Sequence, residues 1–460
     1  MAGNLILAIL FLSLVAYFVG QTQGRRFAYA GTDVQVHSRS VYHGAFVAIW
    51  VGVPALILVL LWLLMQGAVV DRLVIASLPD TMTEGASPAQ LSLWLSEIKN
   101  VAVGQVFSEP TPEIRAAAER YAAWTQIARL AMVVVGLGVA ILALLAARAR
   151  LAPAFRARQG FERAVSAMMV ACSVIAILTT IGIIGALLYE AWLFFRLVPV
   201  AEFLFGLRWE PQIAIRPDQI AGAGAFGAIP VFVGTLLIAT IAMSVAVPIG
   251  LFSAIYLSEF ASDRTRAIVK PLLEILAGIP TVVYGFFAVI VVAPAVRSFG
   301  LSLGIPVAPN TALVAGGVMG IMIIPFISSM TDDALNAVPR SMRDGSLAMG
   351  ATQGETIMKV LLPAALPGIA GGILLAVSRA IGETMIVVMA AGLIATLTFN
   401  PLDSVTTVTV QIVTLLIGDT AFDSAKTLAA FALGLVLFLV TLGLNVVALR
   451  IVQKYREKYD

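Results

Sequence analysis

The sequence predicts an all-α fold, a polytopic membrane protein with about nine transmembrane helices. Of its 460 residues, 60% are apolar and only 12% are charged, whereas soluble domains are about 25% charged. The apolar residues form runs of about 20, which at 1.5 Å per residue cross a hydrocarbon core of roughly 30 Å. The expected spans are residues 4–20, 44–65, 127–147, 164–190, 230–257, 271–296, 309–330, 365–396 and 427–451.

Arginine and lysine in the connections predict the orientation, because both are enriched on the cytoplasmic side. In this arrangement the connections after the first, third, fifth, seventh and ninth spans face one side. They carry Arg25, Arg26, Arg39, Arg148, Arg150, Arg156, Arg158, Arg163, Arg264, Arg266, Lys270, Arg340, Arg343, Lys359, Arg450, Lys454, Arg456 and Lys458. The opposite connection 397–425 holds Asp403, Asp419 and Asp423 and no basic residue. We expect a bacterial inner-membrane protein with a periplasmic N-terminus and a cytoplasmic C-terminus.

Composition also excludes several classes of function. The net charge is only +3, and the basic residues form short clusters without interleaved aromatics, which argues against nucleic-acid binding. A single cysteine, Cys172, excludes an intrachain disulfide, and with His37 and His43 it makes no metal-ligand cluster. No Gly-x-x-x-x-Gly-Lys-Ser/Thr stretch is present to hold nucleotide phosphates. We expect no metal, no cofactor bound by this chain and no enzymatic activity of its own.

The chain divides into a front part and a rear part. Residues 1–147 hold three spans and a periplasmic segment at about 66–126, residues 148–163 form a basic cytoplasmic connection, and residues 164–460 hold six spans. Within the periplasmic segment, Thr111 as a cap and Pro112 in the first turn predict the start of a helix.

The first apolar run has two interpretations, a membrane anchor or a secretory signal. The sequence Ala28-Tyr29-Ala30 is similar to a cleavage site. However, Arg25 and Arg26 follow the apolar run, whereas a signal peptide has its basic residues before it. This order favours a retained anchor.

The longest cytoplasmic connection, 331–364, predicts two short helices that meet at a corner. Gly350 can adopt the left-handed conformation that ends the first helix, and Thr352 with Glu355 forms a capping box for the second. Pro363 is expected to end that second helix because proline lacks a backbone donor. The pattern alone is also compatible with a plain connector.

This loop resembles the cytoplasmic signature of ABC importer permeases: EAA, three residues, glycine, nine residues, isoleucine, one residue, Leu-Pro. The matching positions are Asp344, Gly345, Ser346, Gly350, Val360, Leu362 and Pro363. Asp-Gly-Ser replaces Glu-Ala-Ala, and valine replaces isoleucine. The resemblance implies that the loop docks on a cytoplasmic ATPase, which would use ATP and Mg.

The eighth span contains two charged residues, Arg379 and Glu383, whose four-residue spacing predicts one helical face. Arg379 lies about 20 Å into the span at 1.5 Å per residue. A charge at this depth costs about 2.5–3.5 kcal/mol and must face protein or water. The two side chains could simply neutralise each other and hold helices together. Alternatively, the guanidinium binds a tetrahedral oxyanion, and Glu383 holds the arginine when the site is empty.

The surrounding segment, LAVSRAIGETMIVVMAAG at 375–392, resembles phosphate importer permeases and their pattern R-A-x-G-E-T. The resemblance places Arg379, Gly382, Glu383 and Thr384 on the substrate path. The stretches 203–212, 224–238 and 272–288 also resemble these permeases. The resemblance therefore covers most of residues 164–455. Methionine after Gly-Glu-Thr and the segment at 224 favour the PstC type over the PstA type. The front part, 1–147, lies outside the resemblance.

The resemblance implies a complete importer around this chain. It would contain a second permease of PstA type, an ATPase dimer of PstB type and a periplasmic phosphate-binding protein of PstS type. The binding protein would rest on the connections 191–229 and 397–425, with phosphate as substrate and lipid around the spans. A permease for sulfate or molybdate is one alternative, against which the R-A-x-G-E-T pattern weighs. An ion-coupled secondary transporter or channel is another alternative. The match of the cytoplasmic loop to the spacing of the importer signature argues against it.

Two further features of the sixth span are interpreted structurally. Glu274, four residues after Lys270, has two interpretations, a substrate ligand or an interfacial helix pair with Lys270, and the spacing favours the pair. Pro280 is expected to kink the span, either as a static bend or as a hinge.

Overall fold

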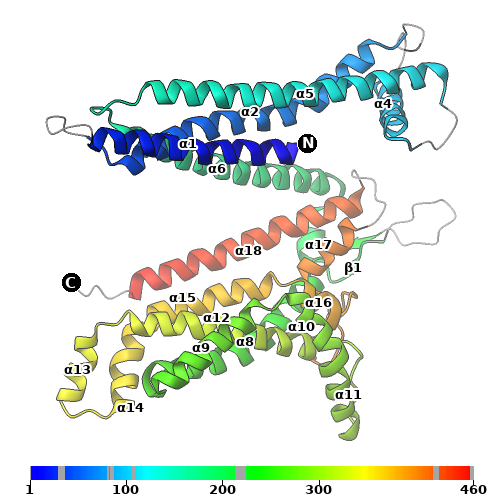
Figure 1. Cartoon of the computed structure of the whole chain (residues 1–460). Helices are drawn as coiled ribbons and strands as arrows, with labels where there is room; N and C mark the ends of the chain where they lie inside the picture. The colour runs from blue at the N-terminus through cyan, green and yellow to red at the C-terminus, as the bar shows by residue number, and fades with distance from the viewer. Residues whose placement is uncertain are drawn as a thin grey trace. The chain divides into compact units, whose positions relative to one another are not determined.

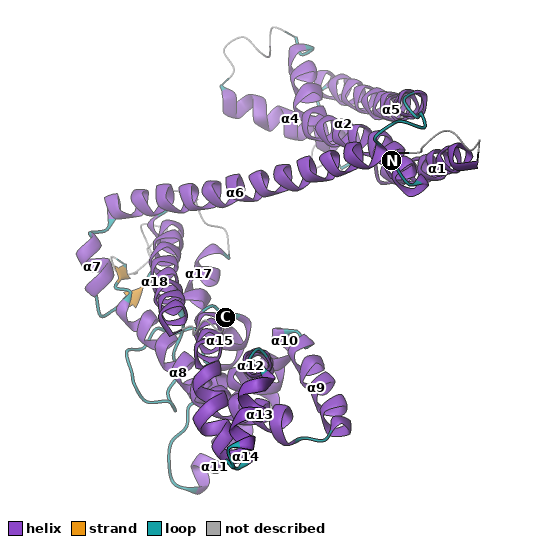
Figure 2. Ribbon diagram, turned by 90° about the vertical axis from the view of Figure 1, so that its left-hand side faces the viewer, coloured by secondary structure: helices purple, strands orange, loops and turns teal. Residues whose placement is uncertain are grey.

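The computed structural model describes residues 2–29, 37–79, 82, 87–105, 110–212, 224–417 and 424–455. Within these ranges, nine helices are long and apolar enough to cross a membrane, which confirms the predicted number of spans. The chain divides into two compact units, Met1–Leu178 and Thr179–Asp460 (Figures 1 and 2). Among the residues named above, Ala30, Asp419, Asp423, Arg456 and Lys458 lie outside the described ranges.

The first unit is a set of long helices with one shorter helix. Its elements are α1 (Ala2–Tyr29), α2 (Ser40–Ala76), α4 (Pro88–Val103), α5 (Pro112–Ala149) and the first half of α6 (Ala157–Leu197). Helix α2 packs along both α1 and α5, and α4 packs on α5 (Figure 1). Thr111 accepts a hydrogen bond from the N–H of Ile114, with Pro112 in the first turn. The predicted start of this helix is therefore confirmed.

The second unit starts in α6 and contains all the elements that follow. These are α7 (Val200–Phe205), β1 (Trp209–Glu210), β2 (Ala225–Phe226), α8 (Ile229–Ile255), η1 (Tyr256–Phe260), α9 (Asp263–Gly278), α10 (Thr281–Phe287), η2 (Ala288–Val292), α11 (Ala293–Ser302), α12 (Ala312–Asn336), α13 (Arg340–Ala348), α14 (Gln353–Thr356), η3 (Ile357–Leu361), α15 (Leu362–Ile381), α16 (Met385–Ala390), α17 (Val408–Leu416) and α18 (Ala425–Tyr455). The two short strands pair antiparallel, with Trp209 opposite Phe226.

Helix α12 is the most buried span of the second unit, and it packs against α8 on one side and α15 on another. Glycines permit the close approach of α8 and α12. A β-carbon at Gly316 would lie 2.7 Å from the Ile241 side chain, and one at Gly320 would lie 2.8 Å from the carbonyl oxygen of Ala242. Small residues replace larger ones at such interfaces because helices in lipid associate through direct packing.

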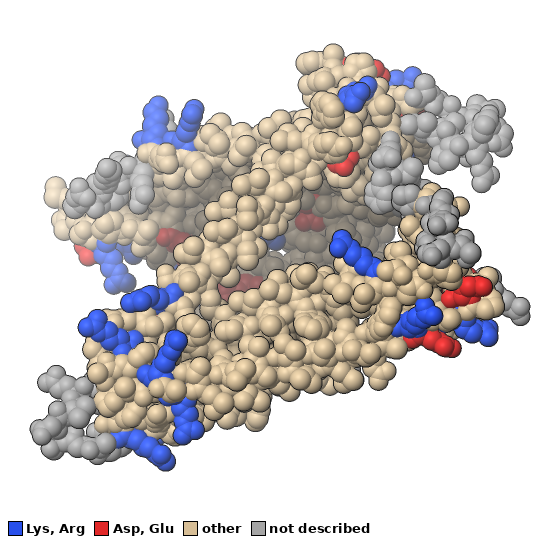
Figure 3. Space-filling view, turned by 90° about the horizontal axis from the view of Figure 1, so that it is seen from above, with Lys and Arg blue, Asp and Glu red and all other residues tan. Residues whose placement is uncertain are grey.

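The face of the molecule drawn in Figure 3 is largely uncharged. Figure 3 shows Lys and Arg mainly toward the left and right of this view, with broad tan regions between them. Leucine, isoleucine, valine and phenylalanine side chains are exposed in large numbers on the long helices. This distribution is the one expected for helices whose flanks contact lipid acyl chains.

The sixth predicted span differs from the structure. Helix α9 ends at Gly278, Pro280 has an extended backbone conformation, and α10 begins at Thr281. The apolar crossing helix runs over Thr281–Ser302. Pro280 therefore separates two helices and does not merely kink one, because proline disfavours a helical conformation in the residue before it.

The expectation that Pro363 ends a helix was wrong. The helix continues from α14 through the π-helical turn η3 into α15. Pro363 follows η3 directly, inside this continuous helix. A π-helical turn bonds five residues back, and its wider loop relieves the clash that proline causes in an α-helix.

We expect Gly320→Leu to destabilise the second unit, because the added side chain meets the backbone of α8. Overpacking of this kind costs about 1–3 kcal/mol. Gly317→Leu is the matched control, since no atom lies within 4 Å of a β-carbon built at that position on the same helix. Thermal unfolding of the purified protein in detergent measures the difference, and equal losses in the two variants would contradict the packing argument.

Candidate functional site

Arg379 lies in the last turn of α15 and its side chain is exposed. The guanidinium carbon is 5.8 Å from the centre of the Phe326 ring on α12, within the range of a cation–π contact. The ring therefore positions the arginine without occupying its hydrogen-bond donors. Arg379 lines a cavity between α9, α12 and α15.

The prediction that Arg379 and Glu383 share one helical face was wrong. Helix α15 ends at Ile381, with Gly382 as its C-terminal cap, so that Glu383 lies beyond the helix. Its Oε1 accepts hydrogen bonds from the N–H groups of Met385 (3.0 Å) and Ile386 (3.3 Å) at the start of α16. Within residues 224–417, all of which are described, no ion pair joins Arg379 to Glu383. The first N–H groups of a helix lack partners within it, and the carboxylate supplies them with an acceptor.

Thr384 lies beside Glu383 in the same turn and is half-buried. Its hydroxyl donates a long hydrogen bond, 3.4 Å, to the carbonyl oxygen of Gly382. A second hydroxyl, that of Thr409 on α17, donates to the carbonyl oxygen of Glu383 at 2.9 Å. The structure thus brings Glu383 and Thr384 together at a helix junction, while Arg379 alone lines the cavity.

The cavity beside Arg379 has a volume of about 260 Å³ and a mixed lining. Its charged residues are Arg266, Lys270, Glu274, Asp332 and Arg379. Three cations less two carboxylates leave a formal charge of +1. The hydroxyls of Ser328 and Ser329 add further hydrogen-bonding groups to the wall. A cavity with this lining can bind an anion through charge-assisted hydrogen bonds.

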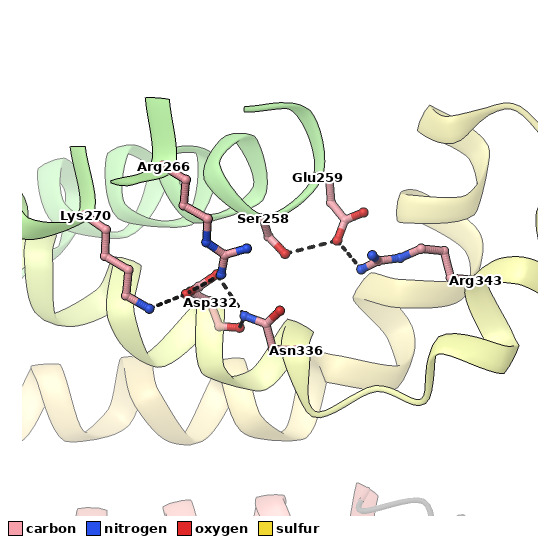
Figure 4. A network of polar contacts seen from close by, with 7 residues as sticks. All are labelled: Ser258, Glu259, Arg266, Lys270, Asp332, Asn336 and Arg343. Atoms are coloured by element: carbon pink, nitrogen blue, oxygen red, sulfur yellow. Dashed lines mark hydrogen bonds and ion pairs between the residues drawn. The ribbon is translucent and has the colours of Figure 1, made fainter. Parts of the chain in front are cut away.

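Asp332 on α12 is the most strongly bonded acid of this cavity (Figure 4). Its side chain is only 7% exposed. Arg266 Nη2 donates to both carboxylate oxygens, at 2.9 and 3.1 Å, and Lys270 Nζ donates to Oδ2 at 2.8 Å. Asn336 Nδ2 donates to Oδ1 at 3.0 Å. We call these four residues the Asp332 clamp, which joins α9 to the end of α12.

The clamp corrects the expected pairing of Lys270 with Glu274. Lys270 turns to Asp332, which lies 62 residues away in the sequence, and Glu274 lines the cavity instead. Reasoning from the sequence also missed Arg266 as a cavity residue. In the sequence, Arg266 is marked only by its place in a basic cluster after the fifth span. Such a cluster is equally well explained by the orientation of the protein in the membrane.

A second buried acid connects the cytoplasmic loop to the spans. The side chain of Glu259 in η1 is 4% exposed, and it pairs with Arg343 of α13. The Ser258 hydroxyl donates to the same carboxylate at 3.0 Å (Figure 4). Gln353 at the start of α14 donates to the backbone carbonyl of Glu259. Both arms of the loop are therefore attached to η1.

The corner of the loop has the predicted geometry. Gly350 has φ +86, in the left-handed region, and Thr352 with Glu355 forms the predicted capping box. Ser346 on α13 lies 2.9 Å, oxygen to oxygen, from the hydroxyl of Thr356, which closes the corner. Met349 at the tip is 89% exposed.

The residues of the predicted signature lie on two arms of this loop. Asp344, Gly345 and Gly350 are exposed on the α13 arm or at the corner, and Ser346 is half-buried there. Val360, Leu362 and Pro363 lie on the helix that leads back into the spans. An exposed corner with an apolar tip, held by a buried ion pair, is suited to contact another protein.

Two family models match the chain. A model described as "Phosphate ATP-binding cassette transporter" matches residues 6–179, and one described as "Binding-protein-dependent transport system inner membrane component" matches residues 246–457. A "Probable ABC transporter permease protein YqgH" from Bacillus subtilis is 33% identical over 60% of this chain and 85% of its own length. The "Phosphate transport system permease protein PstC 1" of Mycobacterium bovis is 32% identical over 55% of this chain and 82% of its own length. This chain belongs to the PstC family of ABC-transporter permeases.

The PstC of Mesorhizobium japonicum is 33% identical to this permease over 47% of the present chain and 70% of its own. Among solved structures, a bacterial alginate ABC transporter matches 66% of the permease and 100% of that chain, at 14% identity and a TM-score of 0.45. The model matched at 6–179 covers the first compact unit almost completely. The front part of the permease therefore matches a family model of its own. The motifs in the rear part of the sequence did not predict this match.

We expect Arg343→Ala to lower the free energy of unfolding by about 1–3 kcal/mol, because it leaves the buried Glu259 carboxylate without its charged partner. Adding Glu259→Gln should recover most of the loss, since the buried charge is then removed as well. Thermal unfolding of the purified permease in detergent measures both effects.

The matched control is Lys359→Ala, which breaks an ion pair with Glu355 whose side chains are 73% and 48% exposed. Exposed pairs of this kind contribute about 0–1 kcal/mol. Equal destabilisation by Arg343→Ala and Lys359→Ala would show that burial of Glu259 has no energetic consequence.

Proposed function

We propose that this permease is the membrane channel subunit of an ATP-driven importer of inorganic phosphate. The observation that carries the proposal is Arg379, which matches the R-A-x-G-E-T pattern of phosphate permeases and presents its guanidinium to a cavity of charge +1. The names of the PstC relatives and the description of the model matched at 6–179 support phosphate as the substrate.

The local geometry suits the passage of an anion. A guanidinium has a planar fork of donors that matches two oxygens of a phosphate, and its charge does not titrate away. Because Glu383 caps α16, it leaves this fork free for the substrate. The carboxylates of Glu274 and Asp332 oppose tight binding. A conducting site must bind its ion well enough to admit it and weakly enough to release it.

The partners belong to the same proposal. The permease supplies no Walker-type cradle for ATP, and the exposed corner at Gly350 is the docking point for an ATPase dimer of PstB type, which would use ATP and Mg. The Glu259–Arg343 pair carries its movement into α8 through η1. A second permease of PstA type faces the cavity, so that phosphate passes between two subunits. A PstS-type protein delivers it to the described parts of 191–229 and 397–425.

Uptake of labelled phosphate into proteoliposomes that hold the full complex tests this function. We expect uptake with binding protein outside and ATP inside, and none without ATP. Arg379→Lys should reduce the rate about tenfold or more, because the ammonium keeps the charge and loses the bidentate fork. Arg297→Lys is the matched control, since Arg297 lies on α11 and is not part of the cavity lining.

The contrary outcomes separate the alternatives. Uptake that does not depend on ATP indicates an ion-coupled transporter. Uptake that sulfate or molybdate suppresses as strongly as unlabelled phosphate indicates a permease for another oxyanion. An unchanged uptake rate in Arg379→Lys would show that transport does not depend on the geometry of the guanidinium.

For the loop, we expect Gly350→Val to abolish co-purification of the ATPase and to leave membrane insertion intact. A β-branched residue at φ +86 is strained and opens the corner. Gly354→Val is the matched control four residues away, because Gly354 lies in the right-handed helix α14 with no atom within 4 Å of an added β-carbon. Wild-type recovery of the ATPase with Gly350→Val would contradict the role of the corner.

A further inference from the structure

The Asp332 clamp has the composition of an anion-binding site that an internal carboxylate occupies. A guanidinium, an ammonium and a side-chain amide all donate to Asp332, at 2.8–3.1 Å. Phosphate oxygens accept hydrogen bonds from the same groups. Buried ion pairs frequently contribute little to stability compared with apolar packing, so that stability alone is a weak reason for this arrangement.

The cations of the clamp retain unused donors. Arg266 contacts Asp332 only through Nη2, although a guanidinium has five N–H donors. Lys270 makes one hydrogen bond and an ammonium has three donors. In the described part of the chain no other hydrogen bond engages these two groups, and both residues line the cavity. Their side chains are 33% and 39% exposed, and are therefore accessible to a small ion.

Residues of the clamp and Arg379 line the same cavity. Phe326, beneath the guanidinium of Arg379, precedes Asp332 by six residues on α12, a separation of about 9 Å along the helix axis. Ser328 and Ser329 line the wall between them. An anion that leaves Arg379 toward the clamp thus moves past hydroxyl donors to a second pair of cations.

We propose that Arg266 and Lys270 form a second phosphate site, at the cytoplasmic end of the cavity, in which Asp332 competes with phosphate and so promotes its release. The inference rests on the proposed function of the permease. Asp332 rebinds the two cations as phosphate leaves, which keeps the buried carboxylate paired. Its negative charge also weakens phosphate binding to the same cations, because like charges close together repel.

The test is inhibition of uptake by phosphate on the inner side. Initial rates of ATP-driven uptake are measured in proteoliposomes that hold the full complex and increasing internal unlabelled phosphate. Asp332→Asn should lower the inhibitory concentration about tenfold, because the competing charge is gone, and Lys270→Gln should raise it by about the same factor. Arg264→Gln is the matched control, since it removes a cation from α9 that does not line the cavity, and it should leave the inhibitory concentration unchanged.

These outcomes distinguish the site from a structural clamp. If both clamp variants only lower the yield or the rate of the complex and keep the wild-type sensitivity to internal phosphate, the inference is overturned while the proposed function stands. If the wild-type complex itself takes up no phosphate with ATP, the proposed function fails and the inference fails with it.

A second measurement needs no variant. Amine-reactive labelling of Lys270 in the wild-type complex without ATP is followed by mass spectrometry, with and without inorganic phosphate. At a phosphate concentration twice the dissociation constant, labelling of Lys270 should slow about threefold, because a third of the sites remain free. Lys359, whose ion pair lies outside the cavity, should label at an unchanged rate. Unchanged labelling of Lys270 at saturating phosphate would overturn the second site.

Discussion

Backbone polar groups that are buried must find partners within the protein, and this constraint organises the second unit. Residues 391–407, between α16 and α17, have no regular helix. Carbonyl oxygens of this segment accept from residues distant in sequence: that of Pro401 from the N–H of Leu313 at 2.8 Å, and that of Asp403 from the N–H of Ala312 at 3.1 Å. Gln411 donates to the carbonyl oxygen of Leu393 and to Thr406, and accepts from the Trp209 indole. Thr235 on α8 accepts from the N–H of Val408. The irregular segment is therefore fixed to the start of α12, and α17, which follows it, is fixed to α8 and to Trp209 of β1.

The same requirement determines which groups remain free for a substrate. Because α15 stops at Ile381, the donors at the start of α16 need an acceptor, and Glu383 supplies it. Arg379 consequently lies beside an aromatic ring, and within residues 224–417 no ion pair joins it to a carboxylate. Asp332 is held by other cations at the far end of the cavity. Interruption of one helix thus separates the charges that a continuous helix would bring together.

The features that the sequence predicts well depend on local chemistry. Runs of apolar residues predict the number of spans, and Gly350, Thr352 and Glu355 predict the corner, because each acts within a few residues of itself. The end of α15 and the Asp332 clamp were missed for the opposite reason. Arg266 and Asp332 are 66 residues apart, and hydropathy does not distinguish a continuous span from one that stops and continues as irregular backbone. The substrate-path roles of Arg379, Glu383 and Thr384 stay predictions.

The glycine contacts between α8 and α12 have a mechanical consequence. Gly316 and Gly320 bring the two backbones so close that sliding one helix along the other would drive side chains into main chain. We therefore expect the pair to move as a single rod whose end carries both Glu259, just after α8, and Asp332, near the end of α12. Tilting that rod displaces both acids at once. A force on the corner loop, such as the proposed ATPase contact would exert, would then move the clamp as well, because the glycine contacts oppose sliding of the two helices.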